Sequence, residues 1–412
     1  MTYIFIFVII RDMKRLLQIG SSTLAMSLIP IICWFLLGVT LDSNIINVFS
    51  LTYSIWFLSQ VIVYIFAVGA NIKKEKENNE NAVLSGMVLG TIVCAVFTAI
   101  FLFNIDNYIT FMSMDVGIYK TFTIYSFTYF FINTIFTFVL HKYYFEGKEK
   151  QANIHSICFN LLNLACLVGV SLITKNQVLI ITIALVVSAV YALIFFFKQF
   201  RKFKLDFNIL TNIKYESADI LYSLILFATY FFGYSNAFSA GQEYVIAINF
   251  VALITDSQWD CCEAISTCAK IDIAKGEYNY KVTRKNALIY SGLLALSSVA
   301  LFFALYNVYG VDLKFGLIYL FMELILFLFN HIDYGFEPFV QLEFSATVNT
   351  TRSIISNVIR FILSAVILNA FCTQIGMVVS CLFSNLVLIL IKFIFYKQEK
   401  DGTLTRKQKK IS

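Results

Sequence analysis

Residues 82–104 read AVLSGMVLGTIVCAVFTAIFLFN, an apolar run without a charged residue. A helix rises 1.5 Å per residue, so about 20 such residues cross a hydrocarbon core of about 30 Å. Eleven other stretches are of similar length and are mainly apolar. The twelve predicted spans are residues 16–39, 45–70, 82–104, 118–140, 154–174, 177–197, 218–236, 244–267, 286–308, 315–339, 353–371 and 373–396. The sequence therefore predicts an all-α polytopic membrane protein.

The basic residues are distributed unevenly between the loops. If both termini and every second loop lie on one side of the membrane, that side carries 27 of the 31 lysines and arginines. The other side keeps Lys120, Lys175 and Lys314, and Arg360 falls within a span. Because positive loops stay in the cytoplasm, we predict a multi-pass protein of the bacterial cytoplasmic membrane with both termini inside. Anionic membrane lipid is a sufficient partner for these loops, and no nucleic acid is expected.

The composition excludes several classes of function. Hydrophobic residues make up 59% of the chain and charged residues 14%, against about 50% and 25% in soluble domains. The nine cysteines form no CxxC pair, and the three histidines are far apart, so the sequence shows no metal-ligand spacing. It also shows no nucleotide-binding loop and no nucleophile motif. We therefore expect no enzyme, no catalytic residue and no cofactor other than a coupling ion, H⁺ or Na⁺.

Short echoes divide the twelve spans into two sets of six. Ser27-Leu28-Ile29 recurs as Ser223-Leu224-Ile225, an offset of 196, and the start of span 82–104 resembles that of span 286–308. An even number of spans per unit gives both halves one orientation, a parallel repeat about an axis along the membrane normal. The predicted parts are an N-terminal six-helix lobe (1–200), a cytoplasmic linker (201–217), a C-terminal six-helix lobe (218–396) and a basic tail (397–412).

The order of these elements resembles the multidrug and toxic compound extrusion (MATE) family, within the superfamily that includes lipid-linked oligosaccharide flippases. The stretches that carry the resemblance are Asn71-Ile72-Lys73, Phe145-Glu146-Gly147-Lys148 leading to Asn160 and Asn163, the basic stretch from Lys198 to Leu210, and Ala264 to Gly276. The resemblance implies two six-helix lobes that open alternately, driven by sodium or protons.

The chain departs from the family's pattern in its first span. Family members with a cation site in the first lobe carry an aspartate there, whereas this chain reads Ile32-Cys33-Trp34-Phe35-Leu36-Leu37-Gly38. The chain has two prolines, Pro30 and Pro338, so a bend in span 16–39 is expected at Pro30.

Acidic residues at membrane depth are concentrated in the second half of the chain. Asp256, Asp260 and Glu263 are spaced i, i+4 and i+7, which places them on one face of a helix. Glu323, Asp333 and Arg360 also fall in spans. An ionisable residue in the membrane is costly and its default reading is functional. We predict that these six residues form the site for the coupling ion or the substrate; the structural alternative is an ion pair between Arg360 and one of the acids.

The sequence supports two hypotheses of function. The leading one is cation-coupled export of an amphipathic, cationic solute by alternating access. The alternative is a flippase for lipid-linked oligosaccharide in polysaccharide biosynthesis, which has the same fold. An anionic pyrophosphate lipid requires basic residues in the cavity, and only Arg360 qualifies in a span. The identity of the solute, the coupling ion and the oligomeric state are not specified by the sequence.

Overall fold

The computed structural model describes residues 2–41, 45, 47–112, 114–200, 204–240, 242–307, 310–314, 316–321 and 323–325, with single positions beyond. The side chains of residues 2–12, 232–249 and scattered others are not part of this description. Predicted spans 353–371 and 373–396 and the tail 397–412 lie almost wholly outside it, as does most of span 315–339.

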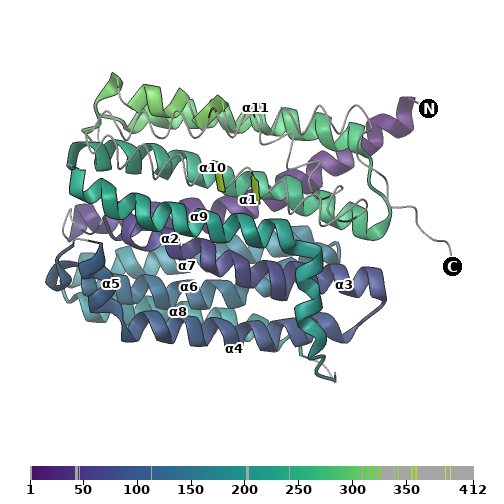
Figure 1. The fold of residues 1–412 in the computed structure, drawn as a ribbon, viewed down its shortest axis with the longest axis horizontal. Helices are drawn as coiled ribbons and strands as arrows, with labels where there is room; N and C mark the ends of the chain where they lie inside the picture. Colours follow the sequence, from purple (N-terminus) through teal and green to yellow (C-terminus); the bar gives the residue numbers. More distant parts are fainter. Residues whose placement is uncertain are drawn as a thin grey trace. The chain divides into compact units, whose positions relative to one another are not determined.

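Within the described residues the regular elements are helices, and none is a strand (Figure 1). They are α1 (Thr2–Thr40), α2 (Asn47–Val63), the π-helical turn η2 (Tyr64–Val68), α3 (Gly69–Glu77), α4 (Asn81–Phe103), α5 (Ile105–Phe111), α6 (Val116–Phe145), α7 (Glu149–Ile173), α8 (Gln177–Phe197), the 3₁₀ turn η3 (Asn208–Asn212), α9 (Ile213–Ala240), α10 (Gln242–Lys275) and α11 (Tyr280–Leu305).

Seven helices in the described part of the chain are long and apolar enough to cross a membrane. They are Met13–Thr40, Ser54–Glu77, Asn81–Phe103, Val116–Phe145, Glu149–Ile173, Gln177–Phe197 and Tyr280–Leu305. Each overlaps one predicted span, so the prediction of an all-α multi-pass membrane protein is confirmed.

Local sequence signals explain where several helices begin. The side chain of Asp115 accepts a hydrogen bond from the Ile118 N–H at the start of α6, and Asn176 does the same for Leu179 at the start of α8. Such caps satisfy backbone donors that have no partner within the helix. Gly147, between α6 and α7, has φ +72°, a conformation that favours glycine. The short loops between spans are thus encoded locally.

The chain divides into two compact units. The N-terminal unit comprises Ser21–Glu216 and Leu226–Ser239, and the C-terminal unit comprises Met1–Gly20, Ser217–Ile225 and the chain from Ala240 onward. Each unit therefore contains a short piece from the opposite half of the sequence, and both α1 and α9 are divided between units. The predicted lobes 1–200 and 218–396 remain a prediction.

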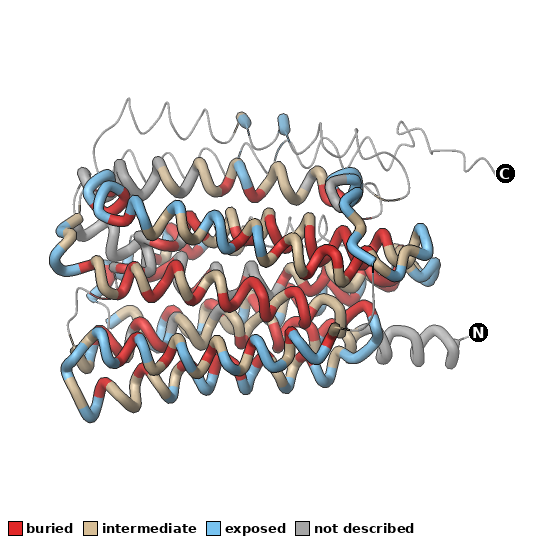
Figure 2. Tube along the Cα trace, turned by 90° about the horizontal axis from the view of Figure 1, so that it is seen from below, coloured by how far each residue is buried: buried red, intermediate tan, exposed pale blue. Residues whose placement is uncertain are grey.

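α6 is the central helix of the N-terminal unit and packs against α2, α4, α7 and α8 (Figure 1). Close approach of α4 depends on glycine, since a Cβ at Gly86 would lie 2.1 Å from the Phe66 carbonyl oxygen of η2. A Cβ at Gly90 would lie 2.7 Å from the ring of Phe138. Buried and exposed positions alternate along the helices (Figure 2), as expected of helices with one packed face.

In the C-terminal unit, α10 packs against α11. Their shared core contains Phe250, Val251, Ile254 and Phe302, with Tyr319 and Leu320 from the segment that follows. This core buries one part of α10, the helix that carries three of the predicted acidic residues.

Candidate functional site

The buried face of α10 follows helical periodicity. Val251, Thr255, Gln258, Cys262 and Ala269 are each at most 3% exposed. At roughly 100° per residue, these five positions lie within about 60° of one another around the helix axis. They form the side of α10 that packs into the C-terminal unit.

The three predicted acids of α10 share one face of the helix. By the same helical register, positions 256, 260 and 263 lie within about 60° of one another around the axis. Buried residues of α10 also occur outside the first group, among them Ala264 and Ile271, and Glu263 is half-buried. We call positions 256, 260 and 263 the acidic face of α10.

The other predicted site residues are described only in part. The backbone of Asp256 and Asp260 is helical, while their side chains lie outside the description. Glu323 is half-buried in the short apolar helix Gly316–Ile325. Asp333 and Arg360 fall outside the described residues, and with them the predicted pairing of Arg360 with an acid.

Two partly buried ion pairs in the C-terminal unit involve residues that the site prediction did not include. Lys270 Nζ lies 2.9 Å from Asp219 Oδ2, and its side chain is 4% exposed. Arg15 forms an ion pair with Asp272. Lys270 and Arg15 were predicted to lie in cytoplasmic loops. Their acidic partners are more than 50 positions away, so no local sequence pattern predicts these ion pairs. These two bases are therefore neutralised by acids of the same unit.

The N-terminal unit contains a buried hydrogen-bonded network made of neutral groups. The Tyr125 hydroxyl donates to Asn163 Oδ1 at 2.7 Å, and Asn163 Nδ2 donates to Ser188 Oγ at 2.9 Å. The Tyr129 hydroxyl donates to Asn160 Oδ1 at 2.9 Å. We call these five residues the neutral network; it joins α6, α7 and α8.

The first helix contributes apolar and aromatic contacts to this region. The ring of Trp34 meets that of Tyr125 edge-on, with centroids 5.6 Å apart, and Cys33 beside it is buried. No acidic residue occurs at positions 32–38, where family members with a first-lobe cation site carry an aspartate. The buried polar groups of this part of the N-terminal unit are thus hydrogen-bonded to one another, and residues 32–38 of α1 add no titratable carboxylate.

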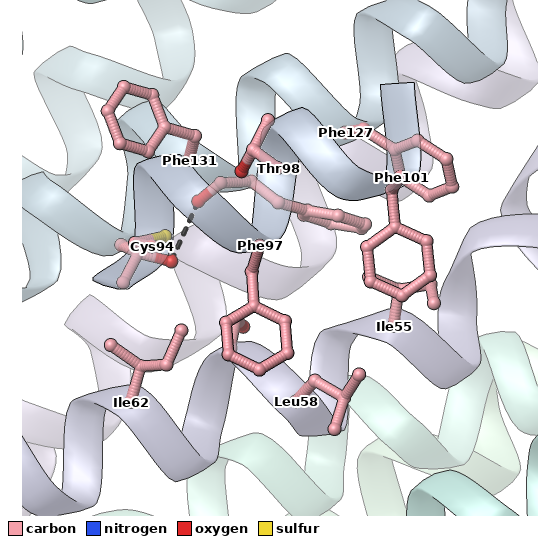
Figure 3. A pocket seen from close by; sticks show the side chains of 12 residues that line it. Ile55, Leu58, Ile62, Cys94, Phe97, Thr98, Phe101, Phe127 and Phe131 are labelled. Carbon is pink, nitrogen blue, oxygen red and sulfur yellow. Dashed lines mark hydrogen bonds between the residues drawn. The ribbon is translucent and has the colours of Figure 1, made fainter. Parts of the chain in front are cut away.

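An apolar pocket lies between α2, α4 and α6 of the N-terminal unit (Figure 3). It is lined mainly by aromatic and aliphatic side chains, among them Ile55, Leu58, Phe97, Phe101 and Phe131. Its cavity volume is about 30 Å³, far below the several hundred Å³ that enclose a drug-sized ligand. In this conformation the pocket therefore holds no complete solute.

Among the described residues, no three His, Cys, Asp or Glu side chains come close enough together to hold a metal ion. The side chains of Asp256 and Asp260 are not among these described residues.

No family model matches the sequence, and no curated protein matches it. Solved structures match almost the whole chain. An outward-facing multidrug resistance MATE transporter of the MOP superfamily is 14% identical, covers 95% of this chain and 96% of its own, and has a TM-score of 0.68. A MOP superfamily transporter from Pyrococcus furiosus is 14% identical over 94% and 97%, with a TM-score of 0.69. The eukaryotic MATE transporter AtDTX14 is 12% identical over 96% and 98%, with a TM-score of 0.68.

The chain therefore has the fold of MATE transporters, which have twelve helices in two lobes. This confirms the resemblance and the fold class predicted from the sequence. The fold is that of a multi-pass membrane transporter, and the solved structures that share it are transporters and not enzymes.

Proposed function

We propose that the protein exports an amphipathic, cationic solute in exchange for H⁺ or Na⁺, and that Asp256 and Asp260 on the acidic face of α10 bind the coupling ion. The fold supports alternating access between two lobes around sites near the midplane. The proposal is carried by one observation, the spacing of Asp256, Asp260 and Glu263, which places three acids on one face of the helix α10.

Carboxylates at membrane depth do not tolerate contact with lipid. An ionised side chain at the centre of the bilayer is costly, so such residues face a water-filled cavity or a charged partner. We therefore place the acidic face at an aqueous pathway. Repulsion between neighbouring carboxylates then favours binding of a proton or a sodium ion.

The three acids have different roles in this proposal. Asp256 and Asp260, one helical turn apart, bind the ion together. Glu263 lies closer to the cytoplasmic end of α10, where it exchanges ions with the cytoplasm. Glu323, Asp333 and Arg360, in the second half of the sequence, are further candidates for binding the ion or the solute. Binding of the ion changes the charge that is buried when the lobes rearrange, which couples ion movement to the opening of one side or the other.

The charges in the structure favour a cationic solute over an anionic lipid pyrophosphate. The most buried bases, Lys73 and Lys270, are each paired with an aspartate, and so is Arg15. Their charge is satisfied within the protein. The solved Pyrococcus furiosus transporter is described as having a binding pocket of reversed polarity that suggests a different function. The sign of the pocket charge therefore separates functions on this fold, and acids on α10 favour a cation.

The proposed membrane is the bacterial cytoplasmic membrane, with both termini in the cytoplasm. This orientation rests on the distribution of basic residues, because 27 of the 31 lysines and arginines fall on one side of the predicted topology. Anionic lipid at the cytoplasmic surface is the proposed partner of those residues.

The experiment is gradient-driven transport of ethidium and tetraphenylphosphonium into inverted vesicles, with an imposed pH or sodium gradient. Asp256→Asn and Asp260→Asn should each abolish gradient-driven transport, because an amide keeps the shape of the side chain but cannot titrate. Asp256→Glu, which retains a carboxyl group, should keep measurable transport. Full gradient-driven transport by both asparagine variants would refute the assignment of the coupling site.

The flippase alternative is tested in the same vesicles with a polyprenyl-pyrophosphate oligosaccharide. We expect no movement of this lipid with either gradient. Its translocation by the wild-type protein, without transport of the cations, would replace the exporter by the flippase.

A further inference from the structure

The first helix of each half of the chain is divided between the two units at an equivalent position. In α1 the boundary falls between Gly20 and Ser21, and in α9 it falls between Glu216 and Ser217. The offset between these boundaries is 196, which is also the offset between Ser27-Leu28-Ile29 and Ser223-Leu224-Ile225. Sequence and structure thus independently align the same two points of the repeat.

The segment before the boundary in α1 is anchored to the C-terminal unit. Arg15 forms an ion pair with Asp272 at the end of α10. Tyr290 of α11 packs directly on Gly20, where an added Cβ would lie 1.8 Å from the tyrosine hydroxyl oxygen. Only glycine fits this contact. We call residues 13–20 the α1 leader.

Immediately after the boundary, α1 is bound to the N-terminal unit. Asn153 Nδ2 donates to Ser21 Oγ at 2.8 Å, and the Tyr144 hydroxyl donates to Ser22 Oγ at 2.6 Å. Ser156 Oγ donates to the carbonyl oxygen of Ser22 at 2.8 Å. The change of unit therefore takes place within Gly20-Ser21-Ser22.

The segment before the boundary in α9 is anchored in the reverse sense, to the N-terminal unit. Lys73 Nζ contacts Asp206 Oδ2 at 3.0 Å and the Asn208 carbonyl oxygen at 3.2 Å. Asn79 Nδ2 also donates to Asp206, at 2.8 Å, and the Asp206 N–H donates to Ser85 Oγ at 2.8 Å. We call residues 204–216 the α9 leader.

A glycine contact and a second ion pair complete this anchor. A Cβ at Gly69 would lie 3.0 Å from Cβ of Asn212, whose side chain donates to the Ile65 carbonyl oxygen at 3.1 Å. Lys214 Nζ lies 2.7 Å from Glu77 Oε1. Beyond the boundary, Asp219 is paired with Lys270 of the C-terminal unit. The change of unit in α9 therefore takes place between Lys214 and Asp219.

We propose that Gly20–Ser22 in α1 and Tyr215–Asp219 in α9 are paired hinges of the transport cycle, and that each leader stays fixed to its anchoring unit throughout. This rests on the proposed alternating-access function. Any movement between units must be taken up where a continuous helix passes from one unit to the other. Sharp bends in helices occur at Gly/Ser pairs, which α1 carries at this point.

The proposal places the bend of α1 about ten residues before Pro30, the position expected from the sequence. α9 returns to the N-terminal unit at Leu226 and leaves it again at Ala240, so it has two further boundaries that α1 lacks. The leaders themselves are held by charge pairs with several additional hydrogen bonds, which favours anchors that persist over anchors that open and close.

Distance measurements between spin labels test the hinges. Labels carried by a noncanonical amino acid, which avoids the nine native cysteines, are placed at the exposed positions Lys14, Lys204, Lys150 and Lys285. Lys150 and Lys285 belong to different units and report movement between them. Distances are recorded in nanodiscs at pH 5 and pH 8, with and without sodium.

We expect the Lys150–Lys285 distance to shift between conditions. The Lys14–Lys285 and Lys204–Lys150 distances should stay fixed, while Lys14–Lys150 and Lys204–Lys285 shift. If Lys14–Lys285 or Lys204–Lys150 shifts together with Lys150–Lys285, the leaders detach and the hinges are refuted, while alternating access stands. If Lys150–Lys285 does not shift in any condition, alternating access is refuted and the hinges with it.

A variant pair tests the hinges functionally. Ser21→Ala with Ser217→Ala replaces the equivalent serines by the strongest helix former, which stiffens both points. We expect turnover to fall several-fold. Ser21→Ala also removes the hydrogen bond from Asn153, so Asn153→Ala, which removes that bond and leaves α1 unchanged, is the control for its loss and should keep its turnover. Thr40→Ala, at the far end of α1, is the matched control and should leave turnover unchanged. Equal turnover in the double variant and the control would overturn the proposal.

Discussion

The two units carry different kinds of polar residues. In the N-terminal unit the neutral network is built from tyrosine, asparagine and serine on α6, α7 and α8. In the C-terminal unit α10 carries Asp256, Asp260 and Glu263 on one face, and Lys270 and Asp272 near its end. Because neutral hydrogen bonds do not change with pH or sodium whereas carboxylates do, the proposed ion coupling belongs to the C-terminal unit.

In the way they hold the two leaders, the two units are alike. Each holds the leader of the opposite half by an aspartate paired with a base, but the polarity is reversed. In the N-terminal unit the leader supplies Asp206 and the unit supplies Lys73, whereas in the C-terminal unit the leader supplies Arg15 and the unit supplies Asp272. The repeat has thus kept the anchor and changed the residues that form it.

The largest expected effect on stability comes from breaking one of these anchors. Lys73→Gln should leave Asp206 without its cation in a largely buried site and lower stability by about 3 kcal/mol. The melting temperature in detergent measures this. The double variant Lys73→Gln with Asp206→Asn should recover most of the loss, because no unpaired charge then remains. A single variant that melts like the wild type would show that the anchor does not hold the leader.

An intermediate effect is expected from the neutral network. Asn163→Ala removes the partner of both Tyr125 and Ser188 and should cost about 1–3 kcal/mol. The loss should be the same at pH 5 and pH 8, since the group removed does not titrate. Gln151→Ala, an exposed amide on the same helix, is the control and should be close to neutral. A loss that depends on pH would contradict the contrast between the units.

The smallest effect is a dependence of stability on acid pH. The hydrogen bond from Lys73 holds the pKa of Asp206 below its usual value. A lowered pKa in the folded state stabilises the protein above the unfolded value of about 3.9, and this contribution is lost as pH falls through the folded value. Thermal melts below about pH 4 should therefore show a loss that the Lys73→Gln, Asp206→Asn variant lacks. If the melting temperatures of the two proteins fell in parallel with pH, the Asp206 carboxylate would not contribute to the pH dependence of stability.

Sequence reasoning recovered the fold because membrane spans are encoded by composition over about 20 residues, with no need for distant contacts. The sequence also pointed to Asn160 and Asn163, which carry part of the family resemblance, and to the repeat offset of 196 that aligns the proposed hinges. The acidic face of α10 follows from spacing alone and stays a prediction, because the side chains of Asp256 and Asp260 lie outside the described residues.

The anchors could not be predicted in the same way. Arg15 and Asp272 are 257 positions apart, and Lys73 and Asp206 are 133 apart. Arg15 and Lys73 were predicted to be charges of cytoplasmic loops, because a sequence shows the sign of a charge but not its distant partner. Likewise, Gly20 has no local pattern that reveals the ring of Tyr290 packed against it.

The central claim is that Asp256 and Asp260 bind the coupling ion, and ion binding to the purified protein tests it most directly. Proton uptake between pH 5 and pH 9 and binding of radioactive sodium are measured in nanodiscs for the wild type and for Asp256→Asn with Asp260→Asn. The account predicts that the wild type binds one of these ions and that the double variant loses this binding while its melting temperature is unchanged. Ion binding by the double variant equal to that of the wild type would contradict the account.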